Sequence, residues 1–264
     1  MHTKSLICAA PEQCRRMTPI RKPSSSILKN VIEDNVVPKI YADHVDRALR
    51  TLFDNTEASH DIVELAGRIV AEGERLPTII DELAHQACTM GALWEDDRID
   101  FFDVTTRVAR LQMIAAQLSS KLERTFLKTG HSILLMPCPH EVHVFGLQLL
   151  ELAFRDAGWA VTRPSVKSEW PGELLGRSHY EAVGLSLSNA GLLPLLREEI
   201  SNLRRASRNQ TLRVLVGGPC FDRGDADVAS VGADAYAPDA WSAPAVADEI
   251  VNEQKLICAG IPTS

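Results

Sequence analysis

The sequence predicts an α/β protein in which an antiparallel helical bundle precedes a doubly wound parallel sheet. Two observations predict this order. Between about residues 39 and 127 the apolar residues recur at helical spacings of three and four. After Gly130, short apolar runs alternate with helical segments, which is typical of an open parallel sheet with helices on both faces. We therefore expect folded regions at 39–128 and 129–264, preceded by an arm at 1–38.

The N-terminal arm is basic and rich in proline and serine. Residues 1–30 hold six lysine or arginine side chains against Glu12 alone. This composition indicates a solvated chain end. The alternative is an arm that docks on an acidic partner or on DNA.

Four helices are expected in the bundle. The first two have apolar faces within 41–52 and 62–69. The third has Pro77 near its start, where proline is well tolerated. The fourth follows Asp100, a predicted N-cap, and carries one long apolar stripe. Short links between them predict antiparallel packing.

Five apolar runs predict the strands, at 133–136, 159–162, 182–187, 212–216 and 235–237. The main helices between and after them are expected at about 141–157, 192–206 and 241–254. In sheets of this kind ligands bind beyond the carboxyl ends of the strands. The loops after Met136, Leu187 and Val216 are therefore where we expect a binding site.

The loop after the first strand contains the sequence Glu-Val-His-Val-Phe-Gly. Its histidine, His143, is a candidate metal ligand, because neutral imidazole is a good donor to transition metals. Glu141 stands two residues earlier and could hold the second ring nitrogen by a hydrogen bond. Gly146 has no side chain, so a bulky planar ligand could approach the first helical turn closely. The alternative is a structural or solvated histidine near a helix start.

The loops after the third and fourth strands are polar and glycine-rich, respectively. Ser186 and Ser188 end the third strand, where their hydroxyls could bind a buried polar ligand tail or cap the strand end. Gly217 and Gly218 could line a pocket or form a plain turn. Neither a Walker lysine nor a G-x-G-x-x-G pattern is present, so this loop has no strong phosphate-binding signature.

Composition limits the classes of function. A formal net charge of -7 argues against nonspecific nucleic-acid binding through the whole surface. The apolar runs are too short to cross a membrane. The six cysteines are scattered, which fits reduced thiols in a cytoplasm, and Cys138 and Cys220 are expected near the same pocket. We expect a cytoplasmic protein with no membrane contact.

Together the three loop motifs resemble the vitamin B12-binding domain of methionine synthase, the corrinoid shuttle proteins and the B12-dependent mutases. That family reads D-x-H-x-x-G, then S-x-L or a close variant, then G-G, at characteristic spacings. In this chain 39 residues separate Gly146 from Ser186, and 28 residues separate Ser188 from Gly217. The resemblance covers the C-terminal half and includes Gly-Ala-Asp at 232–234.

The resemblance implies a Rossmann-like domain that holds cobalamin. His143 would bind cobalt from the lower face, in place of the nucleotide base. The slot for the displaced nucleotide tail would be lined by Ser186, Leu187, Ser188, Gly217 and Gly218. Glu141 departs from the aspartate of the family, and its extra methylene is expected to move the carboxylate relative to His143.

The helical region resembles the helical cap of B12-dependent regulators. The resemblance rests on Gly-Ala-Leu-Trp at 91–94 and Phe-Phe-Asp-Val-Thr at 101–105. It implies that Trp94 and Val104 lie over the upper face of the cobalt. The light-sensing repressors of that group carry a Glu-His pair near the place of Val104, so no histidine upper ligand is expected from that position here. Alternatively, Trp94 is a core aromatic of the bundle.

The basic arm, the helical region and the B12-type motifs resemble most the photosynthesis-gene antirepressors of purple bacteria, AerR and PpaA. This implies a noncatalytic, light- or redox-responsive regulator that contacts a repressor of the CrtJ or PpsR type. Contact with DNA would be made through the repressor or the arm. The alternatives are a corrinoid methyl carrier of a methyltransferase system and a heme-binding sensor on the same fold. No barrel-sized catalytic domain accompanies the motifs, which argues against a mutase.

Overall fold

The computed structural model describes residues 76–122, 130–164 and 170–258. The predicted arm at 1–38 and the first two predicted helices, within 41–52 and 62–69, lie outside these residues. Across the described part, no helix is both long and apolar enough to span a membrane.

Five parallel strands form one sheet in the order β2-β1-β3-β4-β5. Their bounds are β1 Ser132–Pro137, β2 Ala160–Thr162, β3 Ala182–Ser186, β4 Arg213–Gly217 and β5 Ala235–Ala237. The strand order reverses between β1 and β3, which is the switch point where ligands of such sheets bind. The register pairs Pro137 with Ser186 and Ser186 with Gly217, so the loops after β1, β3 and β4 leave the sheet side by side.

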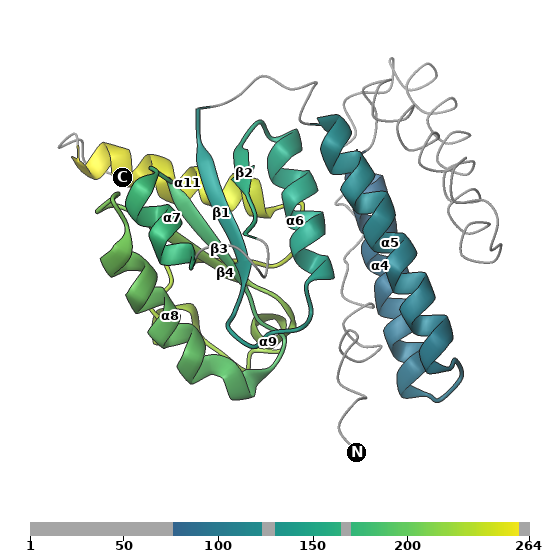
Figure 1. Cartoon of the computed structure of the whole chain (residues 1–264). Coiled ribbons are helices and arrows are strands. Elements are labelled where there is room, and N and C mark those ends of the chain that lie inside the picture. Colours follow the sequence, from purple (N-terminus) through teal and green to yellow (C-terminus); the bar gives the residue numbers. More distant parts are fainter. Residues whose placement is uncertain (1–75, 123–129, 165–169, 259–264) are drawn as a thin grey trace, which may run out of the picture.

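Helices cover both faces of the sheet (Figure 1). Their bounds are α6 Phe145–Asp156, α7 Pro171–Arg177, η1 Ala190–Leu192, α8 Leu193–Ala206, α9 Pro219–Asp222, α10 Val228–Val231 and α11 Ala243–Cys258. In β1, Ile133 and Leu135 belong to the core with α6 and α11, while Leu134 and Met136 belong to the core with α7 and α8. Burial on both faces explains why each central strand reads as a continuous apolar run. The predicted α/β class with a parallel sheet is confirmed.

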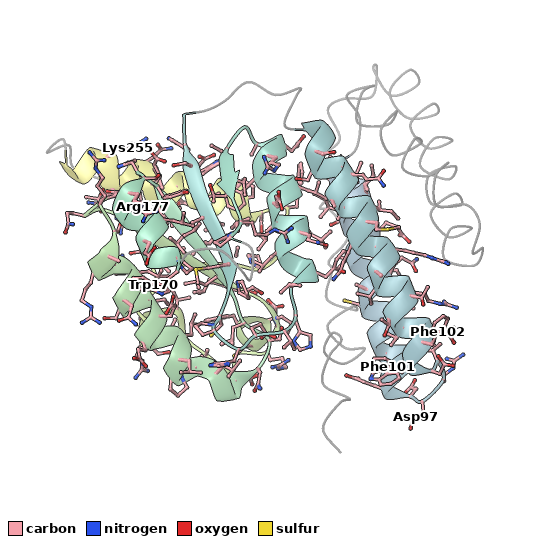
Figure 2. The ribbon with its side chains drawn as sticks, in the orientation of Figure 1. Asp97, Phe101, Phe102, Trp170, Arg177 and Lys255 are labelled. Carbon is pink, nitrogen blue, oxygen red and sulfur yellow. The ribbon has the colours of Figure 1, made fainter. Side chains whose placement is uncertain are left out.

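The other two helices of the described residues form a pair that packs on the outside of α6. They are α4 Leu76–Glu95 and α5 Phe101–Leu122, joined by a short turn (Figure 1). Asp100 caps α5 as predicted, because its Oδ1 accepts a hydrogen bond from the backbone N–H of Asp103 at 2.8 Å. Figure 2 shows Phe101 and Phe102 at the turn end of the pair, where both side chains are exposed.

Helix α6 is the wall shared by the sheet and the pair. Leu147 and Phe154 pack in the core toward the sheet, whereas Leu149 and Leu152 pack in the core with α4 and α5. Ser119 of α5 also donates a buried hydrogen bond of 2.9 Å to Glu151 of α6. The pair is therefore fixed to the helix that begins at the predicted site.

One predicted boundary is wrong: the helix after β1 begins at Phe145, not near Glu141. The carboxylate of Glu141 accepts hydrogen bonds from the backbone N–H groups of Val142 and His143, which holds this stretch as a loop. Strand β3 likewise ends at Ser186, so Ser188 lies in the following loop. The short helices α7, α9 and α10 were not individually predicted.

Candidate functional site

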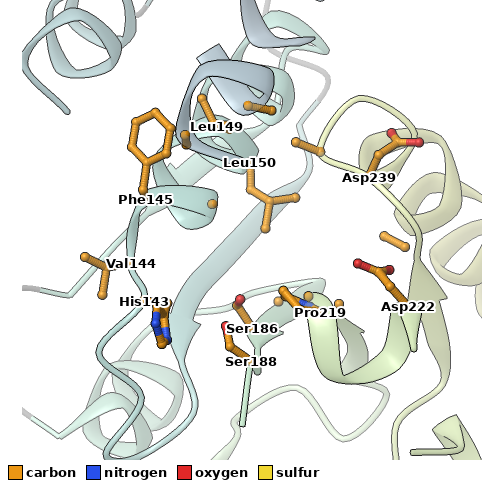
Figure 3. Close-up of a pocket in the computed structure, with 18 of the residues that line it drawn as sticks. His143, Val144, Phe145, Leu149, Leu150, Ser186, Ser188, Pro219, Asp222 and Asp239 are labelled. Carbon is orange, nitrogen blue, oxygen red and sulfur yellow. The ribbon is translucent and has the colours of Figure 1, made fainter. Parts of the chain in front are cut away.

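A cavity of about 710 Å³ lies between the α4–α5 pair and the carboxyl edge of the sheet (Figure 3). Its size falls in the range usual for small-molecule sites. The loop after β1 and the start of α6 form one wall, and the ends of β3, β4 and β5 form the opposite wall. The predicted site residues that line it are His143, Gly146, Ser186, Ser188, Gly217 and Gly218.

His143 and Glu141 form a close pair at this cavity. Nδ1 of His143 lies 2.5 Å from Oε1 of Glu141, and the Glu141 side chain is only 1% exposed. The other carboxylate oxygen accepts the backbone N–H of Ser188 at 2.7 Å. The carboxylate thus joins the loop after β1 to the loop after β3. The extra methylene of glutamate does not carry it out of reach of His143.

The hydrogen bonds determine the charge of Glu141. Burial alone would raise the pKa of this carboxyl group, but the bonds from the His143 ring and from the backbone of His143 and Ser188 outweigh it and lower the pKa to about 2. A charged carboxylate favours the proton of a neutral imidazole on Nδ1. In that tautomer the lone pair is on Nε2, the atom through which such a ring binds a metal.

The start of α6 leaves space for a flat ligand. A β-carbon built on Gly146 would meet no atom within 4 Å, although this glycine lines the cavity. Leu149 and Leu150 continue the same wall with apolar side chains (Figure 3). A planar group could therefore approach the first turn of α6 without a clash.

The backbone conformation and packing of the Gly217–Gly218 turn explain why glycine is required at position 218. Gly218 has φ +101°, and a β-carbon there would lie 2.8 Å from the backbone oxygen of Leu187. The turn packs against that backbone, since the N–H of Leu187 donates to the oxygen of Gly217 at 3.0 Å. The Leu187 side chain is fully buried in the core and does not line the cavity.

The structure does not bring Trp94 and Val104 to the cavity. Trp94 packs edge-on against Phe101 with ring centroids 6.3 Å apart, and Val104 is buried. Both lie near the turn that joins α4 to α5, and the neighbouring Glu95 at the end of α4 does line the cavity. The other lining residues of the pair are Ala84, Ala87, Cys88, Val108 and Gln112.

The expected position of Cys138 and Cys220 beside the pocket is also wrong. Both are buried in the core on the α7–α8 face of the sheet and do not line the cavity. Burial, followed by the carboxylates of Glu141 and Glu199, raises the pKa of Cys138 to about 12. Its thiol is therefore protonated at neutral pH and is a poor metal donor.

Four charged cavity residues were missed at the sequence level: Glu95 at the end of α4, Asp222 and Arg223 at the end of α9, and Asp239 after β5. The available signal was the position of Asp239 just beyond the carboxyl end of a strand. Tyr236 donates a hydrogen bond to Asp222, and burial together with this bond raises the pKa of Tyr236.

A single imidazole is suited to a metal that brings its own ligands. Within 76–122, 130–164 and 170–258, no group of three or more His, Cys, Asp or Glu side chains is placed to hold a metal ion. A macrocycle that supplies in-plane nitrogen donors would need one axial donor from the protein. His143 and the open space at Gly146 fit such a group.

No family model matches the sequence. One similar protein is an uncharacterized 20.5 kDa protein in the bchF-crtJ intergenic region of Rhodobacter capsulatus. It is 26% identical over 188 residues, which cover 69% of this chain and 90% of the relative.

The solved structures that are similar to this one include the following two. The monomethylamine corrinoid protein of Methanosarcina barkeri matches with a TM-score of 0.59 and 18% identity, over 81% of this chain and 99% of that protein. A cobalamin-binding protein of Desulfitobacterium hafniense matches 78% of this chain and 98% of its own, with 16% identity and a TM-score of 0.39. The first of these shows that the chain has the fold of a corrinoid protein.

Proposed function

We propose that this chain is a noncatalytic, cobalamin-binding regulatory protein in which His143 is the axial ligand of cobalt. The observation that carries the proposal is the contact between buried Glu141 and His143 in the loop after β1, where His143 lines a cavity of ligand size. Imidazoles that bind metals almost always donate their second N–H to a carboxylate, a backbone carbonyl or a water molecule. The shared fold with a corrinoid protein supports the same ligand class.

In this proposal the residues at the cavity contribute to cobalamin binding in different ways. Glu141 orients the ring of His143 and keeps the metal-binding lone pair on Nε2. Gly146 leaves room for the flat face of the corrin. The hydroxyls of Ser186 and Ser188 offer hydrogen bonds to the polar nucleotide tail. When bound, cobalamin would supply a cobalt whose upper ligand is sensitive to light or redox state.

The α4–α5 pair closes the cavity on the side opposite the sheet. Ala84, Ala87 and Val108 present small apolar side chains there and exclude water from the upper face. The same helices reach the surface at Phe102 and Met113, which are 75% and 51% exposed. The group above the cobalt would therefore contact helices α4 and α5, and the same two helices present an exposed surface on which a partner would bind.

The regulatory role is supported by the relative from the bchF-crtJ region, because CrtJ is the type of repressor expected as partner from the sequence resemblance. Regulation requires that the partner bind two states of the chain with different affinity. We propose that the state of the cobalt ligand sets that affinity.

A corrinoid methyl carrier is the second candidate function. One observation favours it: Glu141 contacts His143 as the aspartate of the D-x-H-x-x-G pattern would. A heme-binding sensor is a third, and it shares the need for one axial histidine.

The test of cobalamin binding is an absorbance spectrum of the full chain after loading with hydroxocobalamin and desalting. We expect retained corrinoid and a band shift that is lost in His143→Ala. His140→Asn is a matched control, because His140 is exposed in the same loop and asparagine tolerates its φ of +66°. A wild-type chain that retains no corrinoid would refute the proposal, and a parallel hemin sample tests the third candidate.

A second experiment separates the regulator from the carrier. Binding of the loaded chain to a purified CrtJ-type repressor is measured in the dark and after illumination of the adenosylcobalamin form. We expect the affinity to change by roughly fivefold or more, as is usual for coupled sites. Unchanged affinity, together with transfer of a methyl group from a methyltransferase to the bound corrinoid, would favour the carrier.

A further inference from the structure

Carboxylates gather on the cavity wall that faces His143. Figure 3 shows Asp222 and Asp239 on this wall, across the cavity from the His143 loop. Glu95 adds a third carboxylate from the end of α4. Among the described lining residues, Arg223 is the one lysine or arginine, and its Nε is bound to Asp225 at 2.7 Å. The charged part of the lining is therefore predominantly anionic.

Protein donors hold both facing carboxylates in place. The hydroxyl of Tyr236 donates to Oδ1 of Asp222, and the backbone N–H of Ser242 donates to Oδ1 of Asp239 at 2.7 Å. No donor from the described residues is placed on Oδ2 of either side chain. Each aspartate is thus oriented through one oxygen and presents the other as an acceptor.

Acceptors of this kind distinguish two classes of tetrapyrrole-type ligand. Cobalamin carries neutral amides around its ring, and their N–H groups can donate to a carboxylate in a charge-assisted hydrogen bond. Heme and unamidated corrins carry carboxylates at their edge, and these would be repelled by Asp222 and Asp239. The repulsion is stronger in a partly enclosed cavity than in bulk water.

We propose that Asp222 and Asp239 make this cavity selective for amidated corrinoids over macrocycles that carry peripheral carboxylates. The inference rests on the proposed function, and it decides between its two cofactor classes, cobalamin and heme. Asp222 and Asp239 are specificity-determining residues in this account, whereas His143 provides the axial bond to either metal.

The test compares two corrinoids that lack the nucleotide: aquocobinamide, which is amidated, and aquocobyrinic acid, which has free carboxylates. Both carry exchangeable water on cobalt, so His143 can bind in either case. Their dissociation constants are measured at neutral pH by absorbance titration of the full chain, of Asp222→Asn, of Asp239→Asn and of the double variant. Glu253→Gln is the charge-matched control, because Glu253 is exposed on α11 and does not line the cavity.

We expect the wild type to prefer cobinamide by roughly tenfold or more, and the double variant to lose most of that preference through tighter binding of cobyrinic acid. The control should keep the wild-type preference. An equal preference in wild type and double variant would overturn the inference while leaving cobalamin binding intact. A wild type that retains neither corrinoid nor hydroxocobalamin would overturn the proposed function as well.

A second measurement, made on the wild type alone, tests the inference if the double variant does not fold. Screening by salt should reduce the wild-type preference for cobinamide over cobyrinic acid, because the discrimination is electrostatic. A preference that is independent of salt would overturn the inference without any substitution.

Discussion

Replacement of Glu141 by glutamine removes one charge from the buried pair and leaves the side chain nearly the same size. In the folded chain the hydrogen bonds to this carboxylate hold its pKa at about 2, well below its ordinary value of 4.5. The difference between the two pKa values corresponds to about 3 kcal/mol in favour of the folded state when the group is ionised.

The sign of the pH dependence follows from the direction of this change. Because the folded-state pKa lies below the unfolded value, the stabilisation is complete above pH 4.5 and is lost as the pH falls towards about 2. Glutamine does not titrate. The free energy of unfolding of the wild type, taken relative to Glu141→Gln, should therefore fall by about 3 kcal/mol over this window.

The assay is urea unfolding of the full chain without corrinoid, at a series of pH values through that window. Glu253→Gln serves as the control, since its exposed side chain should leave the wild-type pH dependence unchanged. If wild type and Glu141→Gln lose stability in parallel as the pH falls, the carboxylate is not held as the structure indicates.

Three further predictions concern the cavity and the contacts that support it. Gly218→Ala should lower the free energy of unfolding in urea by about 1–3 kcal/mol, because its β-carbon would lie 2.8 Å from a backbone oxygen and its φ is positive. Gly224→Ala is the control, since Gly224 also has a positive φ but has open space around it. This control should lower the free energy of unfolding by less. Gly146→Leu should leave the free energy of unfolding of the apo chain within about 1 kcal/mol of the wild type. The same substitution should abolish corrinoid retention after desalting, because the leucine side chain would enter the open space of the cavity. Ser119→Ala should cost about 1 kcal/mol in the same unfolding assay through loss of its buried hydrogen bond to Glu151, and equal stability would contradict that contact.

Much of the fold could be predicted from sequence because local pattern and tertiary environment agree. Each of the five strands is an apolar run, and parallel connection rules place their carboxyl ends at one edge. That edge brings His143, Ser186, Ser188 and Gly217 to one cavity, although they are far apart in the chain. Their roles toward cobalamin stay predictions.

The rest depended on side-chain contacts that a sequence pattern does not encode. The late start of α6 follows from the hydrogen bonds of Glu141, which compete with the first helical turn. The position of Trp94 away from the cavity depends on how the α4–α5 pair packs along α6. Asp222 and Asp239 were missed because a single acidic residue in a turn normally indicates a solvated surface.

Electron paramagnetic resonance of the chain loaded with cob(II)alamin tests the central claim most directly. The nitrogen that binds cobalt splits the signal, and both His143 and the nucleotide base of cobalamin could supply that nitrogen. Labelling only the histidines with ¹⁵N separates the two sources, because ¹⁵N has a nuclear spin of one half and ¹⁴N a spin of one. We predict that the superhyperfine triplet of the unlabelled protein becomes a doublet on labelling, and that His143→Ala does not show this change. A triplet that persists in the ¹⁵N-histidine protein would contradict ligation of cobalt by His143.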